Sequence, residues 1–423
     1  MLATIIHTSD IPFFFTRFEQ EIQEKHWIRQ VKECKTAIRG NPLLKAYLQK
    51  EYEIAYQLSH MSALAHQYGS IPPEHCMDRT IYPAVGFMAQ VLSAIKQLAP
   101  ADAGRVLGRV KGAFKKPNDM RALRLELTAA THFIRRGKKV GWPEITGTGR
   151  FDLLVEGLGT GALEVECKSI SMDKGRKIHR REILDFYALV KPTVTQTIAG
   201  LSRGLFLVAT LPDRLPKTHD GRVDLAKSCC AAIFHRADQI LPDGTNLRMG
   251  EFPPQEIGVV AKYMNTAEWR VAIDRITNTR NREVMMLSTE AGGVFVLVVQ
   301  SAKDDAFLEA MFKSLGKAAR DQVSGNRPAL LVSGLNDVND SDLRSIAMDE
   351  GDIRKPPTAI RVQVSQFLSS ETRHHIVGVA FFSGSSVSPK QEGVIDTGGI
   401  SYYFAQPQSN FWHEDFNGMF NFL

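Results

Sequence analysis

The chain has 423 residues, of which 43% are hydrophobic and 23% charged, a composition typical of a folded globular protein rather than a disordered or fibrous one. Its longest purely apolar run, residues 294–299, is far shorter than the roughly 20 residues that span a bilayer, so we expect no membrane-spanning helix. A formal net charge of +6 favours polyanionic partners, but this charge alone is weak evidence for nucleic-acid binding.

The cysteines predict a reducing environment. There are five, an odd number; they are scattered along the chain and include the adjacent Cys229 and Cys230. They form neither a disulfide framework nor a CxxC zinc pattern. The N-terminal segment also lacks the basic leader and small-residue cleavage site of a secretory signal. We therefore expect a cytoplasmic protein.

The N-terminal part of the chain has the periodicity of helices. In segments such as "FTRFEQEIQEKHWIRQVKECKTAI", apolar residues recur at intervals of three and four, and the pattern continues with one Gly- and Pro-rich break to residue 116. This pattern predicts an all-helical domain over residues 1–117.

A different order of elements follows. A marked helix begins at residue 118 and ends at Gly137, and three short strand-like runs come next: "KKVGWPEIT", "GRFDLLVEG" and "ALEVECKSI". Helical stretches around residues 180–203 lead to the buried-type strand "GLFLVATLP". The sequence therefore predicts a core of helix, three strands, helix and strand over residues 118–215.

The rest of the chain, residues 216–423, alternates strands with helix. Strand-like runs are "GGVFVLVVQ", "PALLVSGL", "HHIVGVAFFSG" and "GGISYYFAQ", and "DDAFLEAMFKSLGKAARDQV" reads as an amphipathic helix between two of them. The sequence leaves open whether this is a second α/β region or an extension of the first sheet. The predicted fold class is α/β with a helical N-terminal domain.

Charged and apolar residues alternate in "GALEVECKS", residues 161–169. Because successive side chains of a strand point to opposite faces, Glu164, Glu166 and Lys168 share one face. One interpretation is an amphipathic edge strand with this face in water. The other is a chemical site.

A second carboxylate favours the chemical site. Asp152 lies fourteen residues before Glu166, on the preceding predicted strand, and a short hairpin between the strands would bring the two together. Paired carboxylates offer the hard oxygen ligands that Mg²⁺ prefers, and Lys168 on the same face suits an anionic transition state.

Glu126 adds a third carboxylate. It lies along the edge of an apolar stripe on its helix, and no residue three or four positions away is basic. An exposed glutamate paired with a basic neighbour is therefore the less favoured interpretation. A carboxylate turned toward a core is costly unless it is paired or binds a cation.

Glu126 on a helix, Asp152, and Glu166-Cys167-Lys168 together resemble the PD-(D/E)XK nuclease superfamily, which has the restriction-endonuclease-like fold. The order of elements is also similar to that family's core, and the resemblance covers residues 118–211. The proline of the family motif is absent, because Phe151 precedes Asp152.

The resemblance implies roles for these residues. Asp152 and Glu166 would bind one or two Mg²⁺ or Mn²⁺ ions, and Glu126 would reach the metal directly or through water. Lys168 would orient the attacking water or stabilise the pentavalent phosphorus. Glu164 is a lesser candidate that is otherwise solvated.

A basic segment follows the predicted catalytic strand, with five cationic residues within eight positions: Lys174, Arg176, Lys177, Arg180 and Arg181. They are candidate contacts to the phosphates of a nucleic acid. The alternative is an ordinary solvated segment.

The function that the resemblance implies is a metal-dependent endo- or exonuclease, with DNA favoured over RNA and a role in bacterial defence or DNA processing. The flanking regions would shape substrate access or form a homo-oligomer. The alternative is a catalytically inactive, nuclease-like module that binds nucleic acid or supports assembly.

Overall fold

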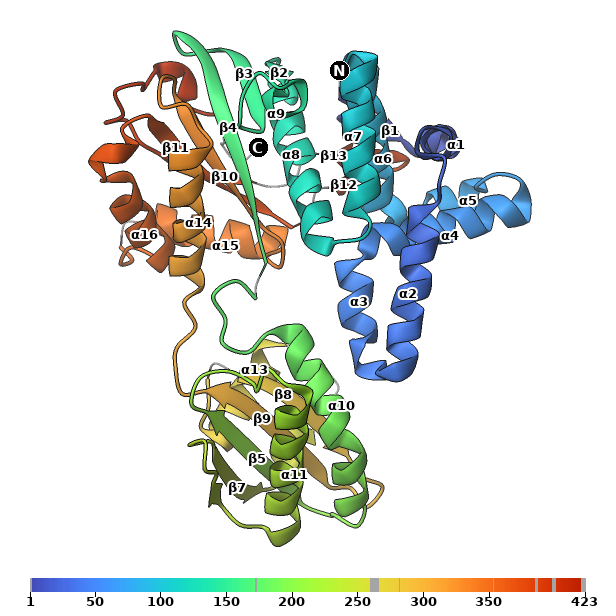
Figure 1. The fold of residues 1–423 in the computed structure, drawn as a ribbon, viewed down its shortest axis with the longest axis vertical. Coiled ribbons are helices and arrows are strands. Elements are labelled where there is room, and N and C mark those ends of the chain that lie inside the picture. The colour runs from blue at the N-terminus through green and yellow to red at the C-terminus, as the bar shows by residue number, and fades with distance from the viewer. Residues whose placement is uncertain are drawn as a thin grey trace. The chain divides into compact units, whose positions relative to one another are not determined.

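The computed structural model describes residues 2–171, 173–258, 266–280, 282–352, 354–384, 387–397 and 401–419. The fold is mixed α/β with a helical N-terminal region, as the sequence predicts (Figure 1). The chain forms two compact units. The first comprises residues 1–36, 48–174 and 308–423, and the second comprises residues 37–47 and 175–307. The expected boundaries, 1–117, 118–215 and 216–423, do not match this division.

Helices dominate the chain up to residue 113, after a short strand β1 (Ile5–His7). They are α1 (Ile11–Ile22), α2 (His26–Gly40), α3 (Lys45–Glu51), α4 (Glu53–Tyr68), α5 (Pro73–Cys76), α6 (Tyr82–Gln97) and α7 (Pro100–Ala113). In the first unit, Trp27, Phe18, Phe87 and Phe114 form a chain of ring contacts, with centroids 5.6 to 6.5 Å apart. Burial of these large rings stabilises this region.

The elements that carry the candidate site come next. They are α8 (Pro117–Arg135), β2 (Lys139–Gly141), α9 (Pro143–Thr146), β3 (Leu153–Leu158) and β4 (Gly161–Ile170). The predicted strand "KKVGWPEIT" is wrong beyond its first residues. Pro143 lacks an N–H for the ladder and occupies the first turn of α9 instead.

Strand β4 lies inside a six-stranded sheet of order β14-β11-β10-β4-β3-β2. It pairs antiparallel with β3 and parallel with β10 (Ala329–Leu335). Strands β4 and β10 run side by side as the green and orange arrows in Figure 1. Strand β11 (Ile376–Ser383) is parallel to β10, and β14 (Ser401–Ala405) is antiparallel to β11. The edge-strand interpretation of "GALEVECKS" is therefore wrong. Of the four strand-like runs predicted over residues 216–423, three extend the first sheet as β10, β11 and β14, whereas "GGVFVLVVQ" belongs to a separate sheet. Both arrangements that the sequence leaves open, a second α/β region and an extension of the first sheet, therefore occur.

The predicted neighbour of β4 is also corrected. The strand "GLFLVATLP" is β5 (Gly204–Leu211), but it belongs to the second unit. Its sheet has the order β6-β7-β5-β9-β8, with β5 parallel to β9 (Val294–Ser301). The other elements there are α10 (Arg180–Thr197), α11 (His219–His235), β6 (Gln239–Ile240), β7 (Asn246–Phe252), α12 (Gln255–Gly258), α13 (Ala267–Thr277) and β8 (Arg282–Ser288). Residues 175–307 thus interrupt the first unit after β4.

The first unit resumes with three helices, α14 (Phe307–Asp321), α15 (Asp340–Gly351) and α16 (Ala359–Leu368). A small sheet of order β1-β13-β12 joins the two ends of this unit through β12 (Val387–Gln391) and β13 (Val394–Thr397). Single 3₁₀ turns occupy Thr8–Asp10, Pro42–Leu44, Arg79–Ile81, Glu371–Arg373 and Glu414–Phe416. Across the part of the chain that the structure describes, none of the helices combines the length and apolarity needed to cross a membrane.

Candidate functional site

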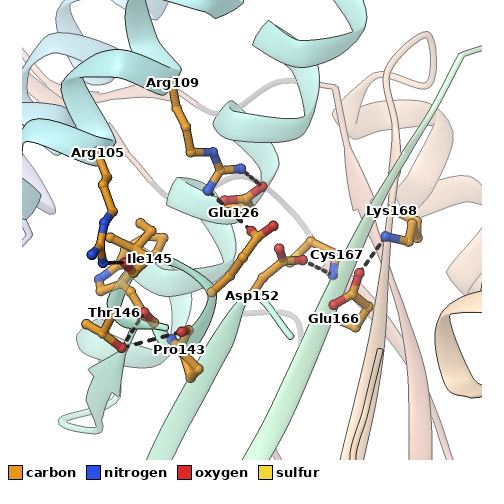
Figure 2. Close-up of polar contacts among 12 residues, drawn as sticks. Arg105, Arg109, Glu126, Pro143, Ile145, Thr146, Asp152, Glu166, Cys167 and Lys168 are labelled. Carbon is orange, nitrogen blue, oxygen red and sulfur yellow. Dashed lines mark hydrogen bonds and ion pairs between the residues drawn. The ribbon is translucent and has the colours of Figure 1, made fainter. Parts of the chain in front are cut away.

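Glu166 is the central residue of the candidate site. Strand β4 has a strand on each side, and the Glu166 side chain is completely buried. Its Oε1 accepts a hydrogen bond from Lys168 Nζ, two residues further along the same face (Figure 2). Its Oε2 has no hydrogen-bond partner among the described residues. A buried carboxylate oxygen without a partner is costly, which marks this position as one shaped by something other than stability.

Asp152 lies immediately before β3, the strand that pairs antiparallel with β4. The pairing of Leu153 with Val165 places Asp152 level with Glu166 across the ladder. Its Oδ2 accepts a hydrogen bond from the backbone N of Cys167 at 2.7 Å. This contact fixes the Asp152 carboxylate beside the strand that carries Glu166 and Lys168.

Glu126, on helix α8, is the third carboxylate of the site, beside Asp152 and Glu166. Its side chain is 4% exposed and points toward Asp152 in Figure 2. The interpretation of Glu126 as an exposed surface glutamate is therefore wrong. Its Oε1 accepts from Arg109 Nη2 at 2.7 Å, and its Oε2 has no hydrogen-bond partner in the described parts of the chain.

All three carboxylates have raised pKa values, chiefly because they are buried. Burial raises the pKa of Glu166 to about 8, with Asp152 and Glu126 adding to the shift and Lys168 opposing it. Burial raises the pKa of Glu126 to about 7, aided by Asp152 and opposed by Arg109. Burial also raises the pKa of Asp152 to about 6, against the Cys167 hydrogen bond and Lys168. Close, buried like charges favour protonation, and a bound cation would relieve the same repulsion.

Lys168 is the cationic member of the site. Burial acts to lower the pKa of its ammonium group, but Glu166 and Asp152 outweigh burial and raise that pKa. Lys168 is therefore held protonated beside Glu166.

The donor set is suited to a hard divalent cation. Carboxylate oxygens are the ligands of Mg²⁺ and Mn²⁺, and Glu166 and Glu126 each keep one buried oxygen without a partner. Within the described residues, however, no three His, Cys, Asp or Glu side chains are arranged as a complete metal site. Glu126 is engaged in an ion pair with Arg109. Asp152 and Glu166 are the pair that would hold an ion first.

Glu164 has a structural role. It is 1% exposed, so the expectation of a solvated side chain is wrong. Its two carboxylate oxygens accept from the backbone N and the Oγ of Ser324, both at 2.7 Å. Glu164 thus anchors the turn between α14 and β10, and it takes no part in the cluster.

The basic segment is divided between the two units. Lys174 belongs to the first unit, and Arg176, Lys177, Arg180 and Arg181 belong to the second. Three of them pair with acids within the second unit. Arg176 lies 2.8 Å from Glu283, which also pairs with Arg180, and Lys177 lies 3.4 Å from Asp213. These three charges are partly neutralised within the protein. Lys174, Arg180 and Arg181 are exposed, whereas Arg176 and Lys177 are partly buried.

Sequence reasoning missed Arg109, on α7. Besides Glu126, its guanidinium approaches Glu144 of α9, with Nη1 3.6 Å from Oε2. Arg105, one turn earlier, donates to the backbone O of Ile145 at 2.5 Å and pairs with Asp102 at 2.7 Å. The signal available in the sequence was the pair of arginines four residues apart in "GRVLGRVKG", next to the Glu126 helix.

Comparison of the chain with protein-family models, with curated proteins and with solved structures finds no match in any of the three.

Proposed function

We propose that this protein is a metal-dependent nuclease that hydrolyses phosphodiester bonds, with DNA favoured over RNA. The observation that carries the proposal is the set of buried carboxylates, Glu126, Asp152 and Glu166, gathered beside Lys168, with two carboxylate oxygens that lack partners among the described residues. A site that is this costly to bury is expected where chemistry requires it.

The order of elements supports the resemblance to the PD-(D/E)XK superfamily. In the first unit, α8 is followed by β2, β3 and β4, with the four-residue helix α9 between β2 and β3, and then by α14 and β10, which pairs with β4. This is the expected order of helix, three strands, helix and strand. Its last two members come after the 175–307 segment, and α10 and β5 have no place in it.

The side chains divide the work as follows. Asp152 and Glu166 would hold Mg²⁺ or Mn²⁺, and Glu126 would complete the site directly or through water. The bound ion supplies a water of lowered pKa and neutralises charge on the phosphate. Lys168, kept protonated, donates to the developing oxyanion or orients the water. Asp152 is held in position by the Cys167 amide and Lys168 by Glu166, so the cluster is ordered before substrate arrives.

The proposal extends to a nucleic-acid partner and a cytoplasmic location. The net charge of +6 supports a nucleic-acid partner, with the basic segment as one source of phosphate contacts. The five cysteines are free thiols, which supports a cytoplasmic location. A role in bacterial defence or DNA processing, and a homo-oligomer, rest on the resemblance alone.

The test is a cleavage assay on single- and double-stranded DNA and RNA with Mg²⁺, Mn²⁺ or EDTA. Asp152→Ala and Lys168→Ala should each lower the rate at least about 100-fold. Glu156→Ala removes a half-exposed carboxylate from the same hairpin and is the matched control, expected to leave the rate unchanged. Cleavage that survives both site substitutions would contradict the proposed site.

One observation favours the alternative, an inactive nuclease-like module that binds nucleic acid or supports assembly. It is the absence of a complete three-ligand arrangement among the described side chains, with Glu126 engaged by Arg109. Salt-sensitive binding to nucleic acid without cleavage in any metal would support this alternative.

A further inference from the structure

Arg109 brings a positive charge to the candidate site from outside the sheet. It lies on α7, and its side chain is about one third exposed. The Nη2 group of its guanidinium donates to the buried Glu126, and the Nη1 group faces the half-exposed Glu144 on α9. Figure 2 shows this guanidinium directed at Glu126 from the side opposite Lys168.

The charges of the metal-free cluster are shared between two cationic side chains. Lys168 pairs with Glu166, Arg109 pairs with Glu126, and Asp152 between them accepts a backbone N–H. Without Arg109, the Glu126 carboxylate would be buried beside two other acids with no cation of its own among the described residues. Such an isolated buried charge is strongly unfavourable, so the arginine stabilises the Glu126 anion while no metal is bound.

A divalent ion at Asp152 and Glu166 would change this balance. It would attract the unpartnered Oε2 of Glu126 and repel the guanidinium bonded to Oε1 of the same carboxylate. The arginine and the ion thus compete for one carboxylate.

We propose that Arg109 is the resident cation of the metal-free site, which competes with the divalent ion for Glu126 and so sets the metal concentration at which the site fills. This inference rests on the proposed function, because it takes the ion to bind at Asp152 and Glu166. It makes Arg109 a positioning residue, which acts through Glu126. A guanidinium displaced from Glu126 becomes available to a phosphodiester, whose geometry it matches.

A purely structural role for Arg109 predicts something different. If the ion pair only fastened α7 to α8, its removal would disorder Glu126 and weaken metal binding. The competition predicts that removal of Arg109 tightens metal binding. The two explanations therefore predict changes in metal affinity of opposite sign.

Arg105 provides the matched control. It lies one turn earlier on α7, and its described partners are Asp102 and the Ile145 carbonyl, neither of which belongs to the carboxylate cluster. Arg105→Gln removes a guanidinium that joins α7 to α9 and leaves Glu126 and its partner intact.

The experiment is thermal unfolding of the full chain during titration with MnCl₂, without nucleic acid. Arg109→Gln should reach half of its metal-induced shift in melting temperature at a Mn²⁺ concentration at least fivefold below that of the unsubstituted protein. Arg109→Lys, which keeps the charge, and Arg105→Gln should stay within twofold of it. An unchanged or higher midpoint for Arg109→Gln overturns the inference. A protein that shows no shift with Mn²⁺, or whose Asp152→Asn variant shifts equally, instead overturns the metal site of the proposed function.

A second measurement covers the case in which Arg109→Gln does not fold. In the unsubstituted protein with ¹⁵N-labelled arginine, the side-chain signal of Arg109, assigned with Arg109→Lys, is followed by NMR during titration with Mg²⁺. The signal should shift in step with the Mg²⁺-dependent rise in melting temperature, while that of Arg105 stays in place. A melting temperature that rises while the Arg109 signal remains fixed overturns the competition.

Discussion

The carboxylate of Asp152 accepts the backbone N–H of Cys167 at 2.7 Å, so a residue at the start of one strand is tied to the strand that carries Glu166 and Lys168. Asp152 therefore has two separable properties. As a hydrogen-bond acceptor it completes a buried backbone amide, and as an anion it belongs to the proposed metal site. The two properties respond differently to substitution.

Asp152→Asn and Asp152→Ala should separate these properties. Both remove the negative charge, so both should abolish the stabilisation of the protein by Mg²⁺. Only Asn keeps an oxygen for the Cys167 amide, and an unsatisfied buried donor costs about 1–3 kcal/mol. Asp152→Ala should therefore unfold with a free energy lower by about that amount than Asp152→Asn, measured by urea denaturation in EDTA at pH 7. Equal stability of the two variants would show that the amide does not depend on this contact.

Glu166 should make the stability of the metal-free protein fall as the pH rises. Its pKa is about 8 in the folded protein against an ordinary value of 4.5, because burial and two neighbouring acids disfavour its anion. Between these values the folded state holds a proton that the unfolded state has lost, so the free energy of unfolding decreases with pH over this window and levels off above it. Glu166→Gln removes the Glu166 part of this dependence, while Glu126 and Asp152 retain theirs.

The measurement is denaturant unfolding of both proteins in EDTA from pH 5 to 9. The gain in stability of Glu166→Gln over the unsubstituted protein should grow with pH, to a value on the order of 5 kcal/mol. Saturating Mg²⁺ should stabilise only the unsubstituted protein, and more at pH 8.5 than at pH 6, because the ion displaces the protons. A difference that is constant with pH would contradict the raised pKa of Glu166.

Local patterns in the sequence predicted the parts of the site that depend on local structure. The helix around Glu126 and the hairpin that brings Asp152 to β4 follow from periodicity and a short turn. The parallel neighbour of β4, on the side away from β3, could not be predicted from the sequence, since β5 and β10 are both apolar and both follow a helix. Parallel pairing depends on the crossover between the strands, and here β10 pairs with β4 across the 175–307 segment.

Two residues of the site region show a second limit. Glu164 was predicted to be solvated because it lies one step from Glu166 on the same face, but its environment is set by Ser324, far along the chain. The helical spacing of Arg105 and Arg109 can be read from the sequence, but the pairing of Arg109 with Glu126 cannot, because an ion pair between helices depends on how the two helices pack. A local sequence pattern therefore does not predict side-chain partners that are brought together by tertiary packing.

Three exposed glycines in α7 lower the stability of the helix that carries Arg109. They are Gly104, Gly108 and Gly112, and a Cβ added at any of them would meet nothing within 4 Å. Glycine inside a helix costs up to about 1 kcal/mol relative to alanine, so Gly108→Ala should raise the free energy of unfolding by about that amount. Gly334→Ala is the contrasting change, because its Cβ would lie 2.9 Å from the Leu125 side chain and should destabilise the protein. Urea denaturation of both variants measures the difference, and a Gly108→Ala variant no more stable than the original would contradict it.

The basic segment should contribute unequally to nucleic-acid binding. Arg176, Lys177 and Arg180 each lie against an acidic side chain of the second unit, although Arg180 is exposed. Lys174 and Arg181 are also exposed. A charge already paired within the protein releases fewer counterions when it meets a phosphate. The double substitution Lys174→Gln and Arg181→Gln should therefore reduce the slope of log K against log[salt] by roughly 1–2, while Lys177→Gln should change it less. Fluorescence anisotropy with labelled DNA in EDTA, from 50 to 300 mM KCl, measures both slopes without cleavage. If Lys177→Gln has the larger effect, the pairing with Asp213 does not persist in the complex; if neither variant changes the slope, the segment does not contact phosphate.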